Sequence, residues 1–255
     1  MNSRPRIIPC LLLKDDYLVK TKKFGKPRYL GDPINIVRLF NEEEADELCI
    51  LDISSHKNNN INFDLLQKIV SEAFMPLAYG GGINNLDDAK RLFRMGFEKL
   101  VFNTGLYKNQ KLIRDVVTYA GTQSVVASVD VKKNFFGRNS CYVNCGKEKV
   151  KLDIYDYLKG IEDLGVGEVI INSINNDGMM SGYDLELIKS FTMNTQLPVV
   201  ACGGAGRLED IKLAIEQGGA HAAAAGSLFV YYGPRNAVLI NYPNESELVR
   251  VGVYK

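Results

Sequence analysis

The sequence has no tryptophan, only two histidines and almost no net charge. Its 31 basic and 30 acidic residues give +1, so there is no electrostatic case for binding nucleic acid or an anionic membrane. It also lacks a signal peptide and any apolar run near the roughly 18 residues that a membrane-spanning helix needs. These absences favour a cytoplasmic protein whose partners are neither nucleic acid nor membrane.

The five cysteines include no C-x-x-C pair, and their number is odd. Cys141 and Cys145 are close in sequence but have no nearby cysteine or histidine to complete a zinc site, so we predict no metal and no cofactor. Reduced thiols in a cytosolic protein fit this pattern best. Of the histidines, His221 begins an apolar run and is expected to be structural, whereas His56 lies in a polar segment and is expected to be solvated.

The most informative stretch runs from residue 197 to residue 227. Residues 198–202 form a short, unalternating apolar run that predicts a strand buried on both faces, and residues 208–217 have helical spacing. Between them lies a glycine-rich turn, and glycine allows the backbone to approach a ligand closely. A second buried run, residues 222–225, ends in a glycine and Ser227. The carboxyl ends of both strands would then expose backbone N–H groups and one hydroxyl, and such donors together can bind a phosphate.

The same pattern occurs earlier, at residues 76–105. A shift of 122 residues superimposes the two glycine-rich turns and the helices that follow them. A shift near half the chain length is the signature of a duplicated half. Two phosphate cradles in one structure imply a substrate with a phosphate at each end. The alternative is two glycine-rich turns kept only for their backbone geometry.

Strand-like and helical segments alternate along the whole chain. Buried strands are predicted at residues 6–13, 47–53, 76–80, 99–103, 124–130, 168–173, 198–202 and 222–225. Strict alternation gives a parallel sheet, and eight βα units close best on themselves. We therefore predict an α/β fold, a (βα)8 TIM barrel with an internal half-barrel repeat, formed by residues 1–255 as a single domain. A doubly wound open sheet is the alternative, but no G-x-G-x-x-G motif opens the chain.

Some segments interrupt this pattern. Residues 14–33 form a polar loop long enough to be a lid, and residues 132–150 look like an inserted hairpin. Residues 231–255 contain only a short helical stretch near Glu245. In a TIM barrel the active site lies at the carboxyl ends of the strands. The residues predicted to ring that mouth are Asp52, Gly81, Gly82, Asn103, Thr104, Asp130, Ser173, Asp177, Gly204 and Ser227.

Motifs between about residue 5 and residue 230 resemble the cyclase subunit of imidazole glycerol phosphate synthase. They are Arg6-Ile-Ile-Pro-Cys-Leu, Gly31-Asp-Pro, Asp46-Glu-Leu, Leu51-Asp-Ile, Gly80-Gly-Gly-Ile, Asn103-Thr, the segment from Ser173 to Asp184, and Cys202-Gly-Gly-Ala-Gly. The resemblance implies that a glutaminase subunit docks on the N-terminal face of the barrel and that ammonia crosses the interior. Ammonia would then react at the opposite face with a bis-phosphate ribulosyl nucleotide, yielding imidazole glycerol phosphate and an aminoimidazole nucleotide.

The resemblance also implies roles for individual residues. One phosphate site would consist of Gly82, Asn103 and Thr104, with Gly81 in the same cradle. The other would consist of Asp177, Gly178, Gly204, Gly226 and Ser227, and Lys20 matches a family lysine that reaches the substrate. The residues that match a charged ring gating the ammonia entrance are Arg6, Glu47, Lys99 and Glu168. Each begins its own strand, so they should converge at the barrel floor; a plain salt-bridge cluster closing the floor is the alternative.

The sequence departs from the family at one catalytic position. The family's cyclase chemistry uses an aspartate at the end of the first strand and another at the end of the fifth, and such a pair can supply acid and base for a ring closure. Asp130 fills the fifth-strand position, but Leu12 stands at the first. The internal repeat independently aligns Leu12 with Asp130. Asp15 and Asp16 follow closely, but their geometry for substituting is poor.

The leading hypothesis is a barrel that keeps the phosphate sites, the ammonia gate and a HisH-like glutaminase partner but has lost ordinary cyclase chemistry. It resembles the cyclase-like subunits of surface-polysaccharide (lipopolysaccharide O-antigen) pathways, in which ammonia amidates a sugar through a third protein, a sugar amidotransferase. The alternatives are a working cyclase, a lyase of histidine biosynthesis, and a non-catalytic scaffold that binds a phosphorylated ligand and regulates a glutaminase. The related sugar-phosphate isomerase also needs a first-strand aspartate, and the charged ring argues against it.

Overall fold

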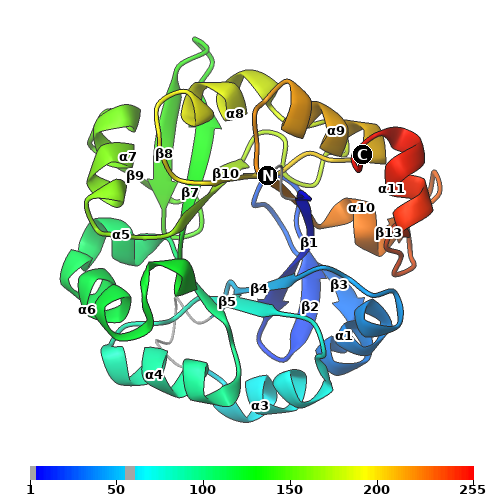
Figure 1. Cartoon of the computed structure of the whole chain (residues 1–255), viewed down its shortest axis with the longest axis horizontal. Helices are drawn as coiled ribbons and strands as arrows, with labels where there is room; N and C mark the ends of the chain where they lie inside the picture. The colour runs from blue at the N-terminus through cyan, green and yellow to red at the C-terminus, as the bar shows by residue number, and fades with distance from the viewer. Residues whose placement is uncertain (1–3, 55–60) are drawn as a thin grey trace.

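In this computed structural model, which describes residues 4–54 and 61–255, eight parallel strands close into a barrel (Figure 1). In ring order they are β1 (Arg6–Lys14), β4 (Leu48–Asp52), β5 (Leu77–Gly80), β6 (Lys99–Phe102), β7 (Val125–Lys133), β10 (Glu168–Ser173), β11 (Val199–Cys202) and β12 (Ala222–Ala225). Each strand pairs with the next, and β12 pairs with β1 to close the ring. The predicted TIM barrel is confirmed.

Helices surround the strands on the outside of the barrel (Figure 1). The longer ones are α1 (Pro33–Glu42), α3 (Phe63–Glu72), α4 (Leu86–Met95), α6 (Gln110–Ala120), α7 (Ile154–Glu162), α8 (Leu185–Thr192) and α9 (Leu208–Glu216); α5 (Thr104–Lys108) and the 3₁₀ helix η1 (Thr122–Ser124) are short. Capping residues explain where these helices begin and end. At α4, for example, the Asn85 side chain accepts a hydrogen bond from Asp88 N, and Gly96 ends the helix in the left-handed conformation.

Each barrel strand is buried on both faces, which explains its unalternating apolar sequence. Along β1, Ile7 and Leu11 pack outward in the main hydrophobic core beneath the helices, whereas Ile8 and Cys10 point into the barrel interior. The interior cluster consists mostly of small and β-branched side chains: Ile8, Cys10, Cys49, Ala78, Val101, Val126, Ile170, Val200, Cys202, Ala222 and Ala224. The two faces of the strands therefore build two separate apolar layers.

The polar segment at residues 14–33 is more ordered than predicted. Instead of a loop that could act as a free lid, it contains β2 (Tyr17–Lys20) and β3 (Arg28–Gly31). β2 pairs antiparallel with the end of β1, and β3 pairs with β2. The prediction of a loop is wrong because Leu18 and Val19 are buried, and their burial outweighs the polar residues around them.

The insertion predicted at residues 132–150 is confirmed as a hairpin. The end of β7 pairs antiparallel with β8 (Asn139–Val143), and β8 pairs with β9 (Glu148–Lys149). This hairpin follows the fifth barrel strand, and the β1–β2 pairing follows the first. The two antiparallel extensions therefore stand four strands apart in the ring, as the predicted half-barrel repeat requires.

The last segment returns to the amino-terminal end of β1. α10 (Ser227–Val230), β13 (Tyr231–Tyr232), β14 (Ala237–Val238) and α11 (Glu245–Val251) follow β12, so the predicted short helix near Glu245 is confirmed. Tyr242 OH donates a hydrogen bond to Ile7 O at 2.9 Å, which ties this segment to the barrel floor. Within the described ranges, no helix combines the length and the apolar character needed to cross a membrane.

Candidate functional site

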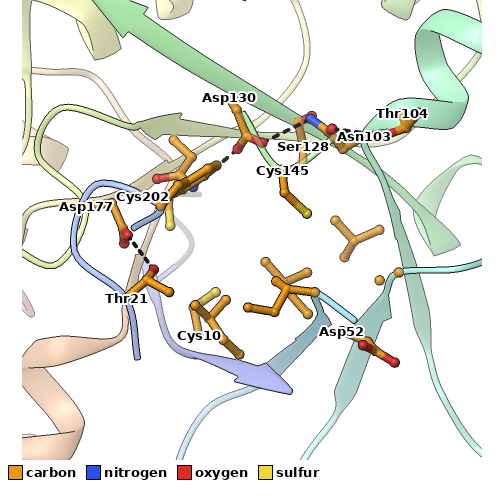
Figure 2. A pocket seen from close by; sticks show the side chains of 18 of the residues that line it. Cys10, Thr21, Asp52, Asn103, Thr104, Ser128, Asp130, Cys145, Asp177 and Cys202 are labelled. Carbon is orange, nitrogen blue, oxygen red and sulfur yellow. Dashed lines mark hydrogen bonds between the residues drawn. The ribbon is translucent and has the colours of Figure 1, made fainter. Parts of the chain in front are cut away.

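The carboxyl ends of the barrel strands surround a cavity of about 720 Å³ (Figure 2). All residues predicted to bind phosphate or substrate line it, together with Asp130: Lys20, Gly81, Gly82, Asn103, Thr104, Asp177, Gly178, Gly204, Gly226 and Ser227. Leu12 and Asp52 line it as well. Ser173 does not, contrary to prediction, because its buried hydroxyl instead donates to Asn176 Oδ1 at 3.3 Å. The cavity has the size expected for a small phosphorylated molecule.

The first predicted cradle is a tight turn after β5. Gly81 has a φ of +120°, and a Cβ there would lie 2.3 Å from Asp52 O, so only glycine fits. Gly82 also has a positive φ. Asn103 Nδ2 donates to a β7 carbonyl at 2.9 Å, and Thr104 Oγ1 accepts from a backbone N–H of the β8–β9 turn at 3.0 Å. The turn thus presents open backbone beside two fixed polar side chains, an arrangement suited to an anion.

The second cradle lies at the ends of β11 and β12. Gly204 has a φ of +123°, and a Cβ there would lie 2.2 Å from Gly182 O. At Gly178 a Cβ would lie equally close to a backbone carbonyl that follows β2. Ser227 Oγ is buried and has no hydrogen-bond partner among the residues that the structure describes. A hydroxyl in this position can donate to a phosphate oxygen.

Lys20 reaches the second cradle from β2. Its Nζ donates to Asp177 Oδ1 at 2.9 Å, and Lys20 is buried. Thr21 Oγ1 donates to Asp177 Oδ2 at 3.2 Å (Figure 2). The lysine also lies beside Gly226, where a Cβ would be 3.0 Å from Lys20 Cε. Strand pairing therefore holds a positive charge at this cradle, where it can attract a phosphate.

Asp130 is a buried carboxyl that lines the cavity. Asn172 Nδ2 donates to its Oδ1 and Asn103 Nδ2 to its Oδ2, each at 3.3 Å (Figure 2 shows the latter). Burial raises the pKa of Asp130 to about 7; the hydrogen bond from Asn172 lowers it, but the charge of Asp177 raises it further. A carboxyl with this pKa can both donate and accept a proton near neutral pH.

Leu12 occupies the position on β1 that Asp130 occupies on β7. Leu12 pairs with β4 on one side and, antiparallel, with Val19 of β2 on the other. Asp130 pairs with β10 and, antiparallel, with Tyr142 of β8. Because β1 and β7 are four strands apart in a ring of eight, the two side chains enter the same cavity from opposite walls. The alignment predicted from the internal repeat is confirmed in space.

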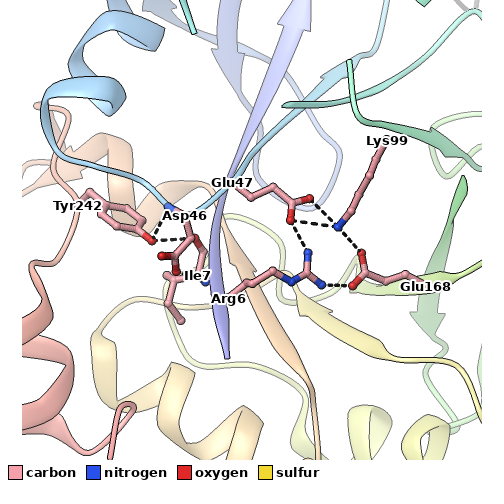
Figure 3. A network of polar contacts seen from close by, with 7 residues as sticks. All are labelled: Arg6, Ile7, Asp46, Glu47, Lys99, Glu168 and Tyr242. Carbon is pink, nitrogen blue, oxygen red and sulfur yellow. Dashed lines mark hydrogen bonds and ion pairs between the residues drawn. The ribbon is translucent and has the colours of Figure 1, made fainter. Parts of the chain in front are cut away.

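A charged ring closes the opposite end of the barrel (Figure 3), formed as predicted by Arg6, Glu47, Lys99 and Glu168. Arg6 donates to Glu47 and Glu168 through its two Nη atoms. Lys99 Nζ lies 3.1 Å from the Glu47 carboxylate and 3.2 Å from that of Glu168. Burial lowers the pKa of Arg6, but the charges of Glu168 and Glu47 more than offset this, and the pKa is raised. Each cation bridges both buried acids.

Comparison with known proteins agrees with this arrangement. A family model described as "Histidine biosynthesis protein" matches residues 6–234. The imidazole glycerol phosphate synthase subunit HisF of Alkaliphilus metalliredigens is 39% identical over 89% of this chain and 90% of its own. The chain belongs to the HisF family. Two provisionally named HisF-family subunits are also similar: hisF2 of Pseudomonas aeruginosa, 45% identical over 96% of this chain and 98% of its own, and HisF of Leptospira borgpetersenii, 47% identical over 96% and 97%.

Sequence reasoning missed residues that hold this HisF-family site together. One of them is Asn172, which donates to Asp130. It lies four residues after Glu168 and therefore on the same inward face of the strand, and this spacing could have identified it. Its Oδ1 is buried without a hydrogen-bond partner in the described ranges. At the floor, Asp46 accepts from Tyr254 OH at 2.9 Å, a contact between residues 208 positions apart that no local pattern reveals.

No histidine lines the mouth of this HisF-family barrel in the part of the chain that the structure describes. No group of three or more histidine, cysteine, aspartate or glutamate side chains in the described ranges is arranged to hold a metal ion. His221 Nδ1 accepts a hydrogen bond from Val199 N at 3.2 Å, as expected of a structural histidine. His56 lies outside the described residues. The polar side chains of the mouth therefore include carboxyl, amide, hydroxyl, thiol and ammonium groups.

Proposed function

We propose that this HisF-family chain is the synthase subunit of a glutamine amidotransferase complex and has lost ordinary cyclase chemistry. A HisH-like glutaminase docks at the barrel floor and releases ammonia there. Ammonia passes through the charged ring and the interior to the mouth, where the two glycine cradles hold a phosphorylated ligand. The relatives named as imidazole glycerol phosphate synthase subunits support the subunit role.

The single observation that carries the loss of cyclase chemistry is the position of Leu12. It faces the cavity from the wall opposite Asp130, where a second carboxyl would complete an acid–base pair. A leucine side chain exchanges no proton. Asp130 alone can supply one acid or one base at a time, which is insufficient for a ring closure that needs both across one substrate.

A carboxylate of the β1–β2 turn is a poor substitute for this missing acid. Asp15 lines the cavity, but its side chain is 69% exposed and lies 3.9 Å from Lys14 Nζ. Asp16 Oδ1 accepts from Asn62 Nδ2 at 2.9 Å, and Asp16 does not line the cavity. Neither carboxyl has the burial that would hold it in place against a substrate.

The interior between the ring and the mouth supports a path for ammonia. Inward side chains on β1 run from Arg6 through Ile8 and Cys10 to Leu12, and the matching positions on the other strands carry mainly alanine, valine and isoleucine. Neutral ammonia can cross such surroundings, whereas ammonium pays a large desolvation penalty. The ring would then act as a gate, since one of its cations must move before ammonia can enter.

The proposed loss of cyclase chemistry also indicates where the ammonia is used. With no acid–base pair at the mouth, we propose that ammonia is consumed by a third protein, a sugar amidotransferase of lipopolysaccharide O-antigen biosynthesis, as in the cyclase-like subunits that the sequence resembles. A working cyclase of histidine biosynthesis is the competing function, because both glycine-rich cradles line the cavity and Asp130 keeps a pKa near 7.

Complementation and glutaminase assays test this function. The chain is expected to fail to rescue a bacterium that lacks its own HisF, while the Leu12→Asp variant restores growth without histidine. Leu12→Asn, similar in size to aspartate but unable to exchange a proton, is the matched control. In parallel, adding the chain to a HisH-like glutaminase should increase glutamate release. Rescue by the natural chain would contradict the loss of cyclase chemistry, and an unstimulated glutaminase would contradict the subunit role.

A further inference from the structure

The inner wall of the barrel carries a cluster of thiols that the proposed function does not use. All five cysteines lie in the described part of the chain, and none is in a disulfide. Cys10 of β1, Cys49 of β4 and Cys202 of β11 belong to the interior cluster and are buried. In the parallel β1–β4 ladder, Cys10 is the direct register partner of Cys49.

Cys10 and Cys202 are the members of this cluster placed to meet a small solute. Cys10 and Cys202 line the mouth cavity and are labelled among its side chains in Figure 2, whereas Cys49 lies behind them in the interior. Hydrogen bonds from Cys202 and Cys49 lower the pKa of the Cys10 thiol well below its usual range, against burial, and the charge of Lys20 adds to this. A lowered pKa favours the thiolate, which is the reactive form of cysteine.

The strand register selects the partner of Cys10. Neighbouring strands lie about 4.8 Å apart, within the Cα separations of roughly 4.4–6.8 Å that a disulfide spans. Cys10 and Cys49 are neighbours of this kind. Cys202 is separated from β1 by β12, so its Cα lies about two strand spacings away, beyond the range of a disulfide without backbone movement.

We propose that Cys10 and Cys49 form a peroxide-responsive dithiol–disulfide couple inside the barrel. The Cys10 thiolate attacks one oxygen of hydrogen peroxide; an S–O bond forms, the O–O bond breaks, and hydroxide leaves and is protonated to water. The Cys49 sulfur then attacks the sulfenic sulfur; an S–S bond forms, the S–O bond breaks, and a second water leaves with the thiol proton. Two thiols are oxidised and one peroxide is reduced to two waters.

The position of the couple on the path of ammonia is a consequence that rests on the proposed function. Cys49 lies in the interior and Cys10 lines the mouth cavity, so both sulfurs stand on the path that the proposed function gives to ammonia. The chemistry of the couple itself does not depend on that function. It is therefore tested on the chain alone, with no partner and no substrate, so that its failure and the failure of the proposed function are distinguishable.

Peptide mapping of the full chain tests the couple. The native protein is treated with hydrogen peroxide, quenched with catalase, alkylated in denaturant and digested without reduction. The expected result is the loss of two alkylatable thiols and the appearance of a Cys10–Cys49 linked peptide that dithiothreitol removes, while Cys141 stays reduced. Linkage of Cys10 to Cys145 or Cys202, or an unmodified Cys10 at a dose that oxidises Cys145, overturns the proposal.

Matched variants separate the two steps. With Cys49→Ala, oxidation of Cys10 should stop at the sulfenic acid, which dimedone traps; with Cys202→Ala, the Cys10–Cys49 linkage should still form. Circular dichroism before oxidation establishes that each variant is folded. Failure of dimedone to label Cys10 in folded Cys49→Ala contradicts the first step. Because the native chain is itself mapped, a variant that does not fold leaves the test intact.

Discussion

Leu12 and Asp130 face each other across the mouth of the barrel, at equivalent positions of its two halves. Each lies where a barrel strand leaves the parallel ring and begins to pair with an antiparallel extension. One position carries an apolar side chain and the other a carboxyl with a pKa of about 7. The half-barrel repeat is thus symmetric in its backbone and asymmetric in its chemistry, and this asymmetry is the basis of the proposed function.

The buried carboxyl of Asp130 should make stability depend on pH. Its pKa is about 7 in the folded chain and about 3.9 when unfolded, so the folded state binds the extra proton between these values. Its contribution to the free energy of unfolding therefore falls as pH rises from about 4 to 7, by up to roughly 4 kcal/mol. The Asp130→Asn variant lacks this pH-dependent contribution to the free energy of unfolding. Urea unfolding should show the variant gaining stability over the natural chain between pH 5 and pH 8; a constant difference would contradict the raised pKa.

Removing one acid of the floor ring should destabilise the barrel strongly. Glu47→Gln leaves Arg6 and Lys99 to share the Glu168 carboxylate, and breaking a buried ion pair in this way costs about 3 kcal/mol. The surface pair of Arg38 and Glu72 provides the control, since Glu72→Gln should cost under about 1 kcal/mol. Equal losses of unfolding free energy in the two variants would show that the ring stabilises the fold no more than a surface ion pair does.

The hydroxyl of Ser227 should matter for ligand binding and little for folding. Because Ser227 Oγ makes no hydrogen bond in the described structure, Ser227→Ala should leave the melting temperature unchanged and weaken the binding of inorganic phosphate. Thr104→Val is the contrasting variant: it removes the acceptor of the Asn144 N–H and should lower stability by about 1 kcal/mol. Calorimetric titration and thermal unfolding measure both. A large stability loss in Ser227→Ala would mean that the hydroxyl has a structural partner.

A side chain at Gly204 should not be tolerated. Its φ of +123° and the 2.2 Å approach of Gly182 O to a Cβ predict that Gly204→Ala distorts the second cradle, lowers the melting temperature and abolishes phosphate binding. Gly160, inside α7 and with nothing within 4 Å of its Cβ position, is the control. Gly160→Ala should raise stability by roughly 0.5–1 kcal/mol. Equal tolerance at both positions would contradict the geometry of the cradle.

The barrel and most of its site could be predicted because they depend on short-range patterns. Unalternating apolar runs indicate strands buried on both faces, and the residue at each strand end must then face the mouth or the floor; this brings Arg6 and Glu168 together although they are 162 positions apart. The alignment of Leu12 with Asp130 follows from the same periodicity. In each case a local rule and the symmetry of the fold determine a distant contact.

The remaining features depend on contacts that no local pattern encodes. β2 forms because Leu18 and Val19 find burial beyond the end of β1, although the segment around them is polar. The C-terminal segment is tied to the floor by Tyr242 and Tyr254, whose partners belong to β1 and to the turn before β4. Such pairings reflect tertiary packing, which overrides the composition of the segment.

The most direct test of the account is cyclase turnover by the purified chain with the bis-phosphate ribulosyl nucleotide and saturating ammonium, measured beside Leu12→Asp and Leu12→Asn. We expect no turnover by the natural chain, a gain in Leu12→Asp and none in Leu12→Asn, because only the aspartate restores a second proton-exchanging group opposite Asp130. Turnover by the natural chain at the rate of an ordinary cyclase would contradict the account and make this a histidine-pathway enzyme with a relocated acid.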